Sequence, residues 1–258
     1  MASILQLALF QLPLIWEEPE TNRKAFSKRL DSISEGTDLI LLPEMFSTGF
    51  TMTPSNIAEE EGPITCEWMR EQAVKTRAAL CGSLVFRENG AYYNRLYFIG
   101  PDGVEYFYDK HHTFTLAGEN EVYASGTDKL ILSYRGFRIC PLICYDLRFP
   151  VWSRNVEGYD LLLYVANWPD TRIAAWDTLL KARAIENMAY CAGVNRIGTD
   201  ANGHRYNGHS AVYDALGNQL VYSEEEAILY AGLELDSLNT TRDSLKFLDD
   251  RDAFSLAQ

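Results

Sequence analysis

Residues 136–150, GFRICPLICYDLRFP, predict a buried strand that runs into a sharp turn and a new helix. The segment 137–143 is mostly apolar and follows Gly136, as in a strand inside a sheet. Cys144 stands at its end, and Pro150 suits the first turn of a helix. A thiol held at such a turn reaches out of the sheet and lies near backbone N–H groups, which favour a thiolate and a developing oxyanion. The alternative is a structural thiol, because free cysteines are commonly buried.

The composition is that of a soluble globular protein with a full core, since 47% of the 258 residues are apolar and 23% are charged. The formal net charge of −13 argues against nucleic acid or an anionic membrane as a partner. No linker, low-complexity segment or repeat divides the chain. We therefore expect a single domain over residues 1–258, in which residues 236–258, poor in apolar side chains, are a candidate C-terminal arm.

The apolar N-terminal residues predict a core strand rather than a targeting segment. Residues 3–15 lack a basic start and are followed by the acidic pair Glu17-Glu18. No apolar run reaches the ~18 residues that a membrane helix needs. The five cysteines are odd in number and irregularly spaced, which disfavours a disulfide framework. These features predict a cytoplasmic protein.

Apolar periodicity predicts alternating strands and helices toward both ends of the chain, with hairpins between them. The predicted helices cover residues 19–35, 63–79 and 173–190. The predicted strands cover residues 3–11, 38–42, 80–86, 92–99, 104–108, 129–134, 137–143, 160–167, 191–198, 209–214, 219–223 and 227–234. This order indicates a layered α/β fold with mixed sheets.

Three chemically reactive residues each follow an apolar run. Glu44 follows LILLP, Lys110 follows EYFYD and Cys144 follows CPLI. Since sites gather at the carboxyl ends of strands in α/β folds, we expect these side chains to meet. Glu44 then suits a general base for a Cys144 nucleophile, and Lys110 suits an oxyanion stabiliser together with the backbone N–H of Tyr145. Taken singly, Glu44 is equally consistent with a turn cap and Lys110 with a surface charge beside Asp109.

Histidine offers a rival mechanism and a rival kind of site. His111 and His112 neighbour Lys110, so one of them is a candidate for a papain-like pair with Cys144. The thiol lies at a central elbow rather than in a papain-type context, which disfavours that pair. His204 and His209 lie five residues apart without a further ligand at metal spacing, so we expect no metal site.

Three stretches together resemble the signature motifs of the nitrilase, or carbon–nitrogen hydrolase, superfamily. They are LLPEMFSTGF at 41–50, YDKHHTFTLAGE at 108–119 and PLICYDLRFP at 141–150, in the order and spacing of that family. Residues 161–196 resemble the segment that follows its nucleophile, so the likeness covers nearly the whole chain.

The resemblance implies a four-layer α-β-β-α sandwich of nitrilase type that forms a homodimer through helices near the active site. It implies Glu44 as base, Lys110 as oxyanion stabiliser and Cys144 as nucleophile, with a thioester intermediate and no metal or organic cofactor. The family often has a second glutamate after the lysine, which implies that Glu119 orients Lys110 or relays a proton. Glu121 is a weaker match, and a solvated loop carboxylate is the alternative for Glu119.

Within the superfamily, the chain is most similar to the omega-amidase branch. The similar pieces are PEMFSTGFTM, DKHHTF, ICYDLRFP, NWP and KARAIENMAY. That branch hydrolyses the terminal amide of 2-oxo acids such as 2-oxoglutaramate and 2-oxosuccinamate. The alternatives are another amidase of the superfamily, acting on N-carbamoyl amino acids or aliphatic amides, and a catalytically inactive homologue that serves as a binding or scaffold subunit.

A small-molecule amide that carries a carboxylate needs a cation in its pocket. Arg172 is the first candidate and Arg148 the second, although an ion pair with Asp146 is an alternative for Arg148. Four aromatic residues are candidates to wall the pocket, or alternatively to fill the core: Phe46, Phe114, Tyr145 and Trp168.

Overall fold

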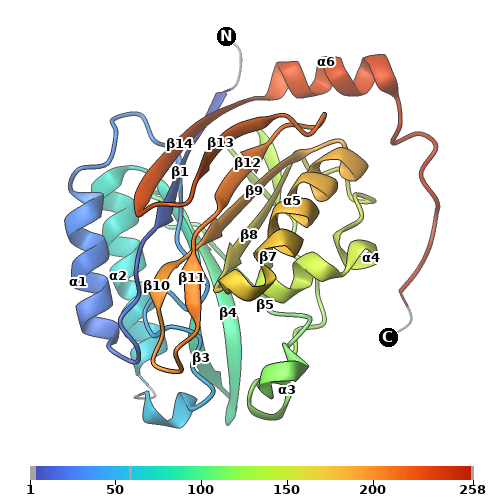
Figure 1. Ribbon diagram of the computed structural model, residues 1–258. Coiled ribbons are helices and arrows are strands. Elements are labelled where there is room, and N and C mark those ends of the chain that lie inside the picture. The colour runs from blue at the N-terminus through green and yellow to red at the C-terminus, as the bar shows by residue number, and fades with distance from the viewer. Residues whose placement is uncertain (1–3, 58–59, 257–258) are drawn as a thin grey trace.

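The computed structural model describes residues 4–57 and 60–256. Residue 3 of the first predicted strand and residues 257–258 of the predicted arm lie outside this range. Two six-stranded sheets form the centre of the molecule (Figure 1). No helix in the described part of the chain is long and apolar enough to cross a membrane.

The first sheet has the strand order β14-β1-β2-β3-β4-β5. Its central strands β1, β2 and β3 are parallel, and the outer pairings are antiparallel. The bounds are β1 Ile4–Gln11, β2 Leu39–Leu41, β3 Ala79–Glu88, β4 Ala91–Ile99, β5 Glu105–Asp109 and β14 Ala227–Glu234.

The second sheet has the order β13-β12-β9-β8-β7-β6, with β7, β8 and β9 parallel. The bounds are β6 Leu132–Tyr134, β7 Phe137–Ile143, β8 Leu161–Ala166, β9 Tyr190–Asn195, β12 Ser210–Tyr213 and β13 Gln219–Ser223. A separate hairpin joins β10 (Ile197–Thr199) to β11 (Arg205–Asn207).

Helices cover the outer face of each sheet. In Figure 1, α1 and α2 flank the first sheet, while α4 and α5 flank the second. The α-helices are α1 Pro19–Leu30, α2 Glu61–Thr76, α3 Glu119–Val122, α4 Pro150–Ser153, α5 Ile173–Asn187 and α6 Leu235–Leu245. Short 3-10 helices are η1 Pro54–Asn56, η2 Thr115–Ala117, η3 Cys144–Arg148 and η4 Asp170–Arg172.

The alternation of side chains along β1 explains the layering. Leu5, Leu7 and Leu9 belong to the core between the sheets, while Ala8 and Phe10 pack in the core under α1 and α2. Because successive side chains on a strand point to opposite faces, the unbroken apolar run at residues 7–10 must be covered on both sides. The α-β-β-α sandwich predicted from the resemblance is confirmed.

The structure refines the local predictions. The first helix ends at Leu30 instead of residue 35, and Ser32 Oγ bonds the carbonyl of Arg29, as serine does where it competes with helix hydrogen bonding. In the predicted helix 63–79, α2 turns Met69 and Ala73 toward the sheet, so Val74 is 65% exposed. Pro150 begins the helix α4, in agreement with the prediction, and the turn before it is the 3-10 helix η3 that starts at Cys144.

The predicted C-terminal arm begins with α6, which packs on its own chain. Leu238 is buried, and Arg242 forms an ion pair with Asp160 at 2.6 Å. After a turn at residues 247–250, the chain continues to residue 256 without a helix or strand along the side of the molecule (Figure 1).

Candidate active site

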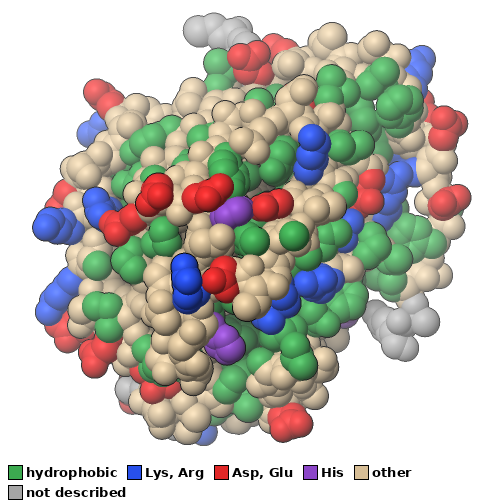
Figure 2. Space-filling view, in the orientation of Figure 1, with side chains coloured by type: hydrophobic (Ala, Val, Ile, Leu, Met, Phe, Trp, Pro, Cys, Tyr) green, Lys and Arg blue, Asp and Glu red, His purple; other side chains and the backbone are tan. Residues whose placement is uncertain are grey.

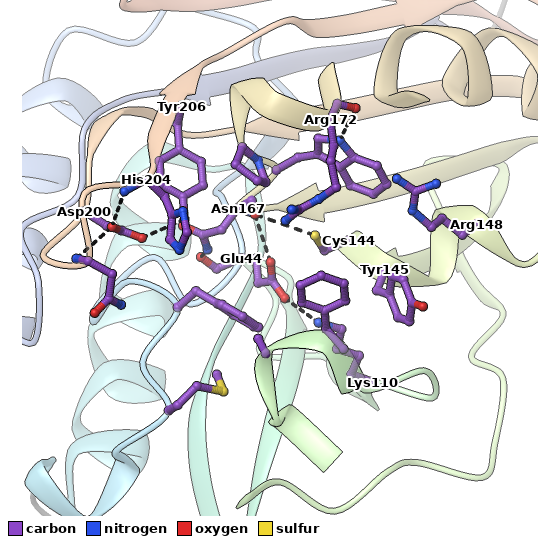
Figure 3. A pocket seen from close by; sticks show the side chains of 17 residues that line it. Glu44, Lys110, Cys144, Tyr145, Arg148, Asn167, Arg172, Asp200, His204 and Tyr206 are labelled. Carbon is purple, nitrogen blue, oxygen red and sulfur yellow. Dashed lines mark hydrogen bonds and ion pairs between the residues drawn. The ribbon is translucent and has the colours of Figure 1, made fainter. Parts of the chain in front are cut away.

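Glu44, Lys110 and Cys144 meet at one end of the two sheets (Figure 3). Glu44 follows β2, Lys110 follows β5, and Cys144 follows β7 in the second sheet. The Nζ of Lys110 lies 2.8 Å from Oε1 of Glu44. The side chains of Glu44 and Lys110 are fully buried and Cys144 is 9% exposed, so this acid–base set is largely shielded from bulk water.

Cys144 lies at a strained elbow. Its φ is +40°, in the left-handed region that side chains other than glycine disfavour. The turn is held by Asp146, whose Oδ2 accepts a hydrogen bond from the backbone N of Ile143 at 3.0 Å. The strain directs the thiol out of the sheet and into the cavity that it lines.

Asp146 also holds the histidine that follows Lys110. Its Oδ1 lies 2.8 Å from Nδ1 of His112 and 3.0 Å from the His112 backbone N. His111 stacks on Trp152, with ring centroids 3.8 Å apart. Neither histidine lines the cavity, so the geometry gives the papain-like alternative no support.

Arg148 makes no ion pair with Asp146 in the described structure, which contradicts that alternative for Arg148.

Glu119 lies on the other side of Lys110. Its Oε2 is 2.8 Å from Nζ of Lys110 and accepts the backbone N–H of Phe114 at 2.5 Å. Glu119 is fully buried, which excludes the solvated loop alternative, whereas Glu121 is exposed. Lys110 is therefore clamped between two carboxylates.

The local charges define the resting protonation state. Burial raises the pKa of the Cys144 thiol well above its usual value, the charge of Glu44 raises it further, and Lys110 opposes both. The thiol is therefore neutral at neutral pH and needs a base to become a nucleophile. For Lys110, burial lowers the pKa, but the charges of Glu119 and Glu44 raise it more, so Lys110 stays protonated.

The three catalytic candidates open into a cavity of about 280 Å³. Three of the aromatic candidates, Phe114, Tyr145 and Trp168, line it. Phe46 does not: it is fully buried under the helices, against Phe26. For Phe46 the core alternative therefore applies, because its side chain points to the face of the sheet that α1 and α2 cover.

The cavity also holds two cationic side chains, and Figure 3 shows Arg172 directed toward the centre. The guanidinium of Arg172 lies 5.1 Å from the Phe114 ring centroid, and that of Arg148 lies 5.0 Å from the Trp168 ring centroid. Trp168 also donates its indole N–H to the carbonyl of Arg172 at 2.9 Å. Within the described residues, no carboxylate pairs with either arginine.

Comparison with known proteins agrees with this geometry. Residues 6–243 match the carbon–nitrogen hydrolase family. The chain belongs to that family. The omega-amidase YafV of Yersinia enterocolitica is 46% identical to this hydrolase, over 98% of this chain and 99% of its own. The 2-oxoglutaramate amidase of Bacillus subtilis is 30% identical, over 95% of this chain and 96% of its own.

A solved structure is also similar to this carbon–nitrogen hydrolase over nearly its whole length. It is XC1258 from Xanthomonas campestris, described as a CN-hydrolase superfamily protein with an arsenic adduct in the active site. The TM-score is 0.95 at 39% identity, covering 98% of this chain and 99% of the other. The predicted superfamily is therefore confirmed.

Asn167 is a site residue of this hydrolase that the sequence interpretation missed. Its backbone N donates to Oε2 of Glu44 at 2.9 Å, and its side-chain amide donates to the Glu44 carbonyl oxygen. Asn167 follows β8 directly. It therefore satisfies the same strand-end rule that singled out Glu44, and that rule would have found it.

The β10–β11 hairpin supplies a wall of the hydrolase pocket that no sequence motif indicated. Asp200, His204 and Tyr206 line the cavity and lie on the side away from Arg148 in Figure 3. Oδ2 of Asp200 accepts the Tyr206 hydroxyl at 2.9 Å, and Oδ1 accepts the His204 backbone N at 2.9 Å. Asp200 thus holds the hairpin loop in shape at the pocket mouth. Figure 2 shows acidic and basic side chains interspersed over this face of the molecule.

Proposed function

We propose that this carbon–nitrogen hydrolase is an omega-amidase, which hydrolyses the terminal amide of a 2-oxo acid such as 2-oxoglutaramate or 2-oxosuccinamate to the 2-oxo acid and ammonia. The observation that carries the proposal is the pair Arg172 and Arg148, two guanidinium groups without carboxylate partners among the described residues, in the same cavity as Cys144. An unpaired arginine in a substrate pocket suits a carboxylate ligand. The names of the relatives from Yersinia enterocolitica and Bacillus subtilis support it.

The first half of the proposed reaction forms a thioester. Glu44 takes the proton of Cys144 while the sulfur attacks the amide carbon. The negative charge that develops on the carbonyl oxygen is stabilised by the Lys110 ammonium and the backbone N–H of Tyr145. Glu44 then gives the proton to the amide nitrogen, the C–N bond breaks, and ammonia leaves.

The second half releases the acid. Glu44 takes a proton from a water molecule, whose oxygen attacks the thioester carbon. The C–S bond breaks, the 2-oxo acid leaves, and the proton returns to the Cys144 sulfur. Glu119 accepts hydrogen bonds from Lys110 throughout and orients the ammonium. The residues involved supply base, oxyanion stabiliser and nucleophile, and we propose that no metal or organic cofactor takes part.

The test is ammonia release from a panel that contains 2-oxosuccinamate, 2-oxoglutaramate, glutamine, an N-carbamoyl amino acid and an aliphatic amide. We expect turnover of the two 2-oxo amides and its loss in Cys144→Ala. Preference for the N-carbamoyl amino acid or the aliphatic amide would keep the catalytic residues and replace the substrate. No turnover, with Cys144 inert to iodoacetamide, would favour an inactive binding or scaffold homologue.

The substrate carboxylate is tested separately with Arg172. We expect Arg172→Met to raise KM for 2-oxosuccinamate by about 10-fold or more, the usual size for a hydrogen bond to a charged group. Turnover of an uncharged aliphatic amide should change much less. Arg205→Met is the matched control, because Arg205 is 78% exposed at its side chain and lies outside the cavity. Equal losses on charged and neutral amides would contradict the carboxylate role of Arg172.

The remaining proposals concern the whole protein. We propose that residues 1–258 act as one hydrolase domain, that the molecule is a homodimer, and that it works in the cytoplasm. Exposed apolar side chains on α4 and α5, such as Val151 at 51% and Ile185 at 44%, support the dimer. Five free cysteines in the described structure support a reducing compartment.

A further inference from the structure

Asn94 on β4 lies between the two buried carboxylates. Its Nδ2 is 2.8 Å from Oε1 of Glu44 and 3.1 Å from Oε1 of Glu119. The Nζ of Lys110 lies 2.8 Å and 3.1 Å from the same two oxygens. The four groups therefore close a ring in which two donors alternate with two acceptors. The backbone N of Lys110 also donates to the carbonyl oxygen of Asn94 at 3.0 Å, which holds the two side chains in register.

The polarity of the Asn94 amide follows from its neighbours. Only the NH2 group can face two carboxylates, because the amide oxygen would repel them. Oδ1 of Asn94 consequently finds no hydrogen-bond donor among the described residues, although the side chain is only 1% exposed. An unpaired buried oxygen destabilises a fold. Its presence here is explained by the requirement for a donor with two hydrogens at this point.

The ring restricts where Glu44 can take up a proton. Oε1 of Glu44 already accepts from both Asn94 and Lys110. Oε2 accepts one hydrogen bond, from the backbone N of Asn167 at 2.9 Å, and keeps a lone pair. The thiol of Cys144 is also close enough to Glu44 for the two groups to affect each other's charge.

We propose that Asn94 is a positioning residue of this hydrolase: its two amide hydrogens hold the carboxylates of Glu44 and Glu119 in place around Lys110 and reserve Oε2 of Glu44 for the proton of Cys144. The inference rests on the base and nucleophile roles in the proposed function, but it does not depend on which amide is the substrate. Asn94 has no titratable group, so it cannot divert the proton from Glu44 to Glu119.

Among the described residues, the phenols Tyr123 and Tyr206 also interact electrostatically with Glu44. Burial raises the pKa of both phenols above their usual range, so both stay neutral through roughly pH 5–9, where hydrolases are commonly assayed. When activity is plotted against pH, a shift of the low-pH side of the curve (the acid limb) therefore reports on the carboxylates and not on the phenols.

The test compares Asn94→Ala and Asn94→Asp with the wild type. The pH profile of kcat/KM and the rate of Cys144 alkylation by iodoacetamide are both measured. Cys144 is the cysteine to follow, since the other four are at most 2% exposed. Removing a donor from ionised carboxylates disfavours their charged form, so the acid limb should move to higher pH by about one unit in Asn94→Ala. Asn94→Asp adds a third carboxylate and should move the limb further.

Asn155 provides the matched control. It is fully buried, and its Nδ2 donates to the carbonyls of Tyr159 at 2.9 Å and Asn187 at 3.1 Å, outside the cavity. Asn155→Ala should lose stability while keeping the wild-type acid limb. If Asn94→Ala does not fold, Asn94→Ser, which keeps one donor, should fold and show a smaller movement of the limb in the same direction.

The outcomes separate this inference from the proposed substrate. If the acid limb of the pH profile stays at its wild-type pH in both Asn94→Ala and Asn94→Asp, the proposed role of Asn94 is overturned. An equal movement in Asn155→Ala would do the same. If the wild type turns over none of the 2-oxo amides but the alkylation limb moves in the Asn94 variants, the substrate proposal fails and the Asn94 proposal stands.

Discussion

Cys144, the proposed nucleophile, has an unfavourable backbone conformation. A φ of +40° is disfavoured by about 1–2 kcal/mol for a residue with a Cβ. The surrounding structure maintains this conformation because Ile143, Asp146 and Asn167 fix the backbone and side chain around it. Stability is thus reduced locally to hold the sulfur in the cavity.

This strain predicts opposite effects of glycine at two cysteines. Cys144→Gly should be more stable than Cys144→Ala by about 1 kcal/mol, which corresponds to about 2–4 °C in Tm for a domain of this size. At Cys140, in the regular strand β7, glycine should instead be less stable than alanine. Differential scanning calorimetry of the four variants measures both differences. The same sign at both positions would refute the role of the strained φ.

At the scale of elements, Asp146 joins three segments that carry the site. Its carboxylate accepts hydrogen bonds from Ile143 at the end of β7, from the Tyr108 hydroxyl on β5 at 2.8 Å, and from His112 in the loop after Lys110. The segments that carry Lys110 and Cys144 therefore share one fully buried anchor. This anchor sets the distance between the predicted oxyanion stabiliser and the nucleophile.

Asp146→Asn tests that anchor. The variant keeps the shape of the side chain but turns an NH2 group toward groups that donate, which should destabilise the fold by about 2–4 kcal/mol. We also expect slower alkylation of Cys144, because the elbow loosens. Asp214→Asn is the control, since Asp214 accepts turn hydrogen bonds from Leu216 and Asn218 at a half-buried position. Chemical denaturation and iodoacetamide kinetics measure the two effects, and a wild-type alkylation rate in Asp146→Asn would argue against coupling.

At the scale of the whole molecule, the site needs both sheets. Glu44 and Lys110 follow strands of the first sheet, while Cys144 and Asn167 follow strands of the second. The apolar layer between the sheets therefore determines whether the proposed base, Glu44, and the proposed nucleophile, Cys144, face each other. Helices α4 and α5, on the outer face of the second sheet, lie next to the elbow and carry the exposed apolar side chains of the proposed dimer contact.

The proposed dimer makes a prediction about mass in solution. Arg154 donates to the carbonyl of Glu186, so the short helix α4 adjoins the C-terminal end of α5. The double variant Val151→Glu with Ile185→Glu should convert a dimer to a monomer, because charges are costly in an apolar contact. Val74→Glu, on the exposed face of α2, should remain dimeric. Light scattering after size-exclusion chromatography measures the molar mass of each variant in solution. A monomeric wild type, or a double variant that stays dimeric, would rule out this contact.

The residue patterns by themselves determined a layered α/β fold with mixed sheets and the elbow at Cys144, because these depend on neighbours along the chain. The sandwich of two covered sheets was implied by the family resemblance. Strand β1 alternates side chains between two apolar layers, and the apolar run 137–143 ends in a cysteine followed by turn residues. Glu44 and Lys110 were found by the same local rule of position after a strand. The resemblance, rather than any pattern of residues, pointed to Glu119.

Only the tertiary structure decided which polar groups surround those residues. Asn94 precedes Lys110 by sixteen residues and looks like an ordinary strand residue, yet it binds two carboxylates once β4 and β5 pair. The β10–β11 hairpin contributes Asp200, His204 and Tyr206 to a cavity that residues of both sheets line. The physical reason is range: periodicity and turns act between neighbours in the chain, whereas hydrogen bonds and charge interactions act between atoms that packing brings within a few ångströms.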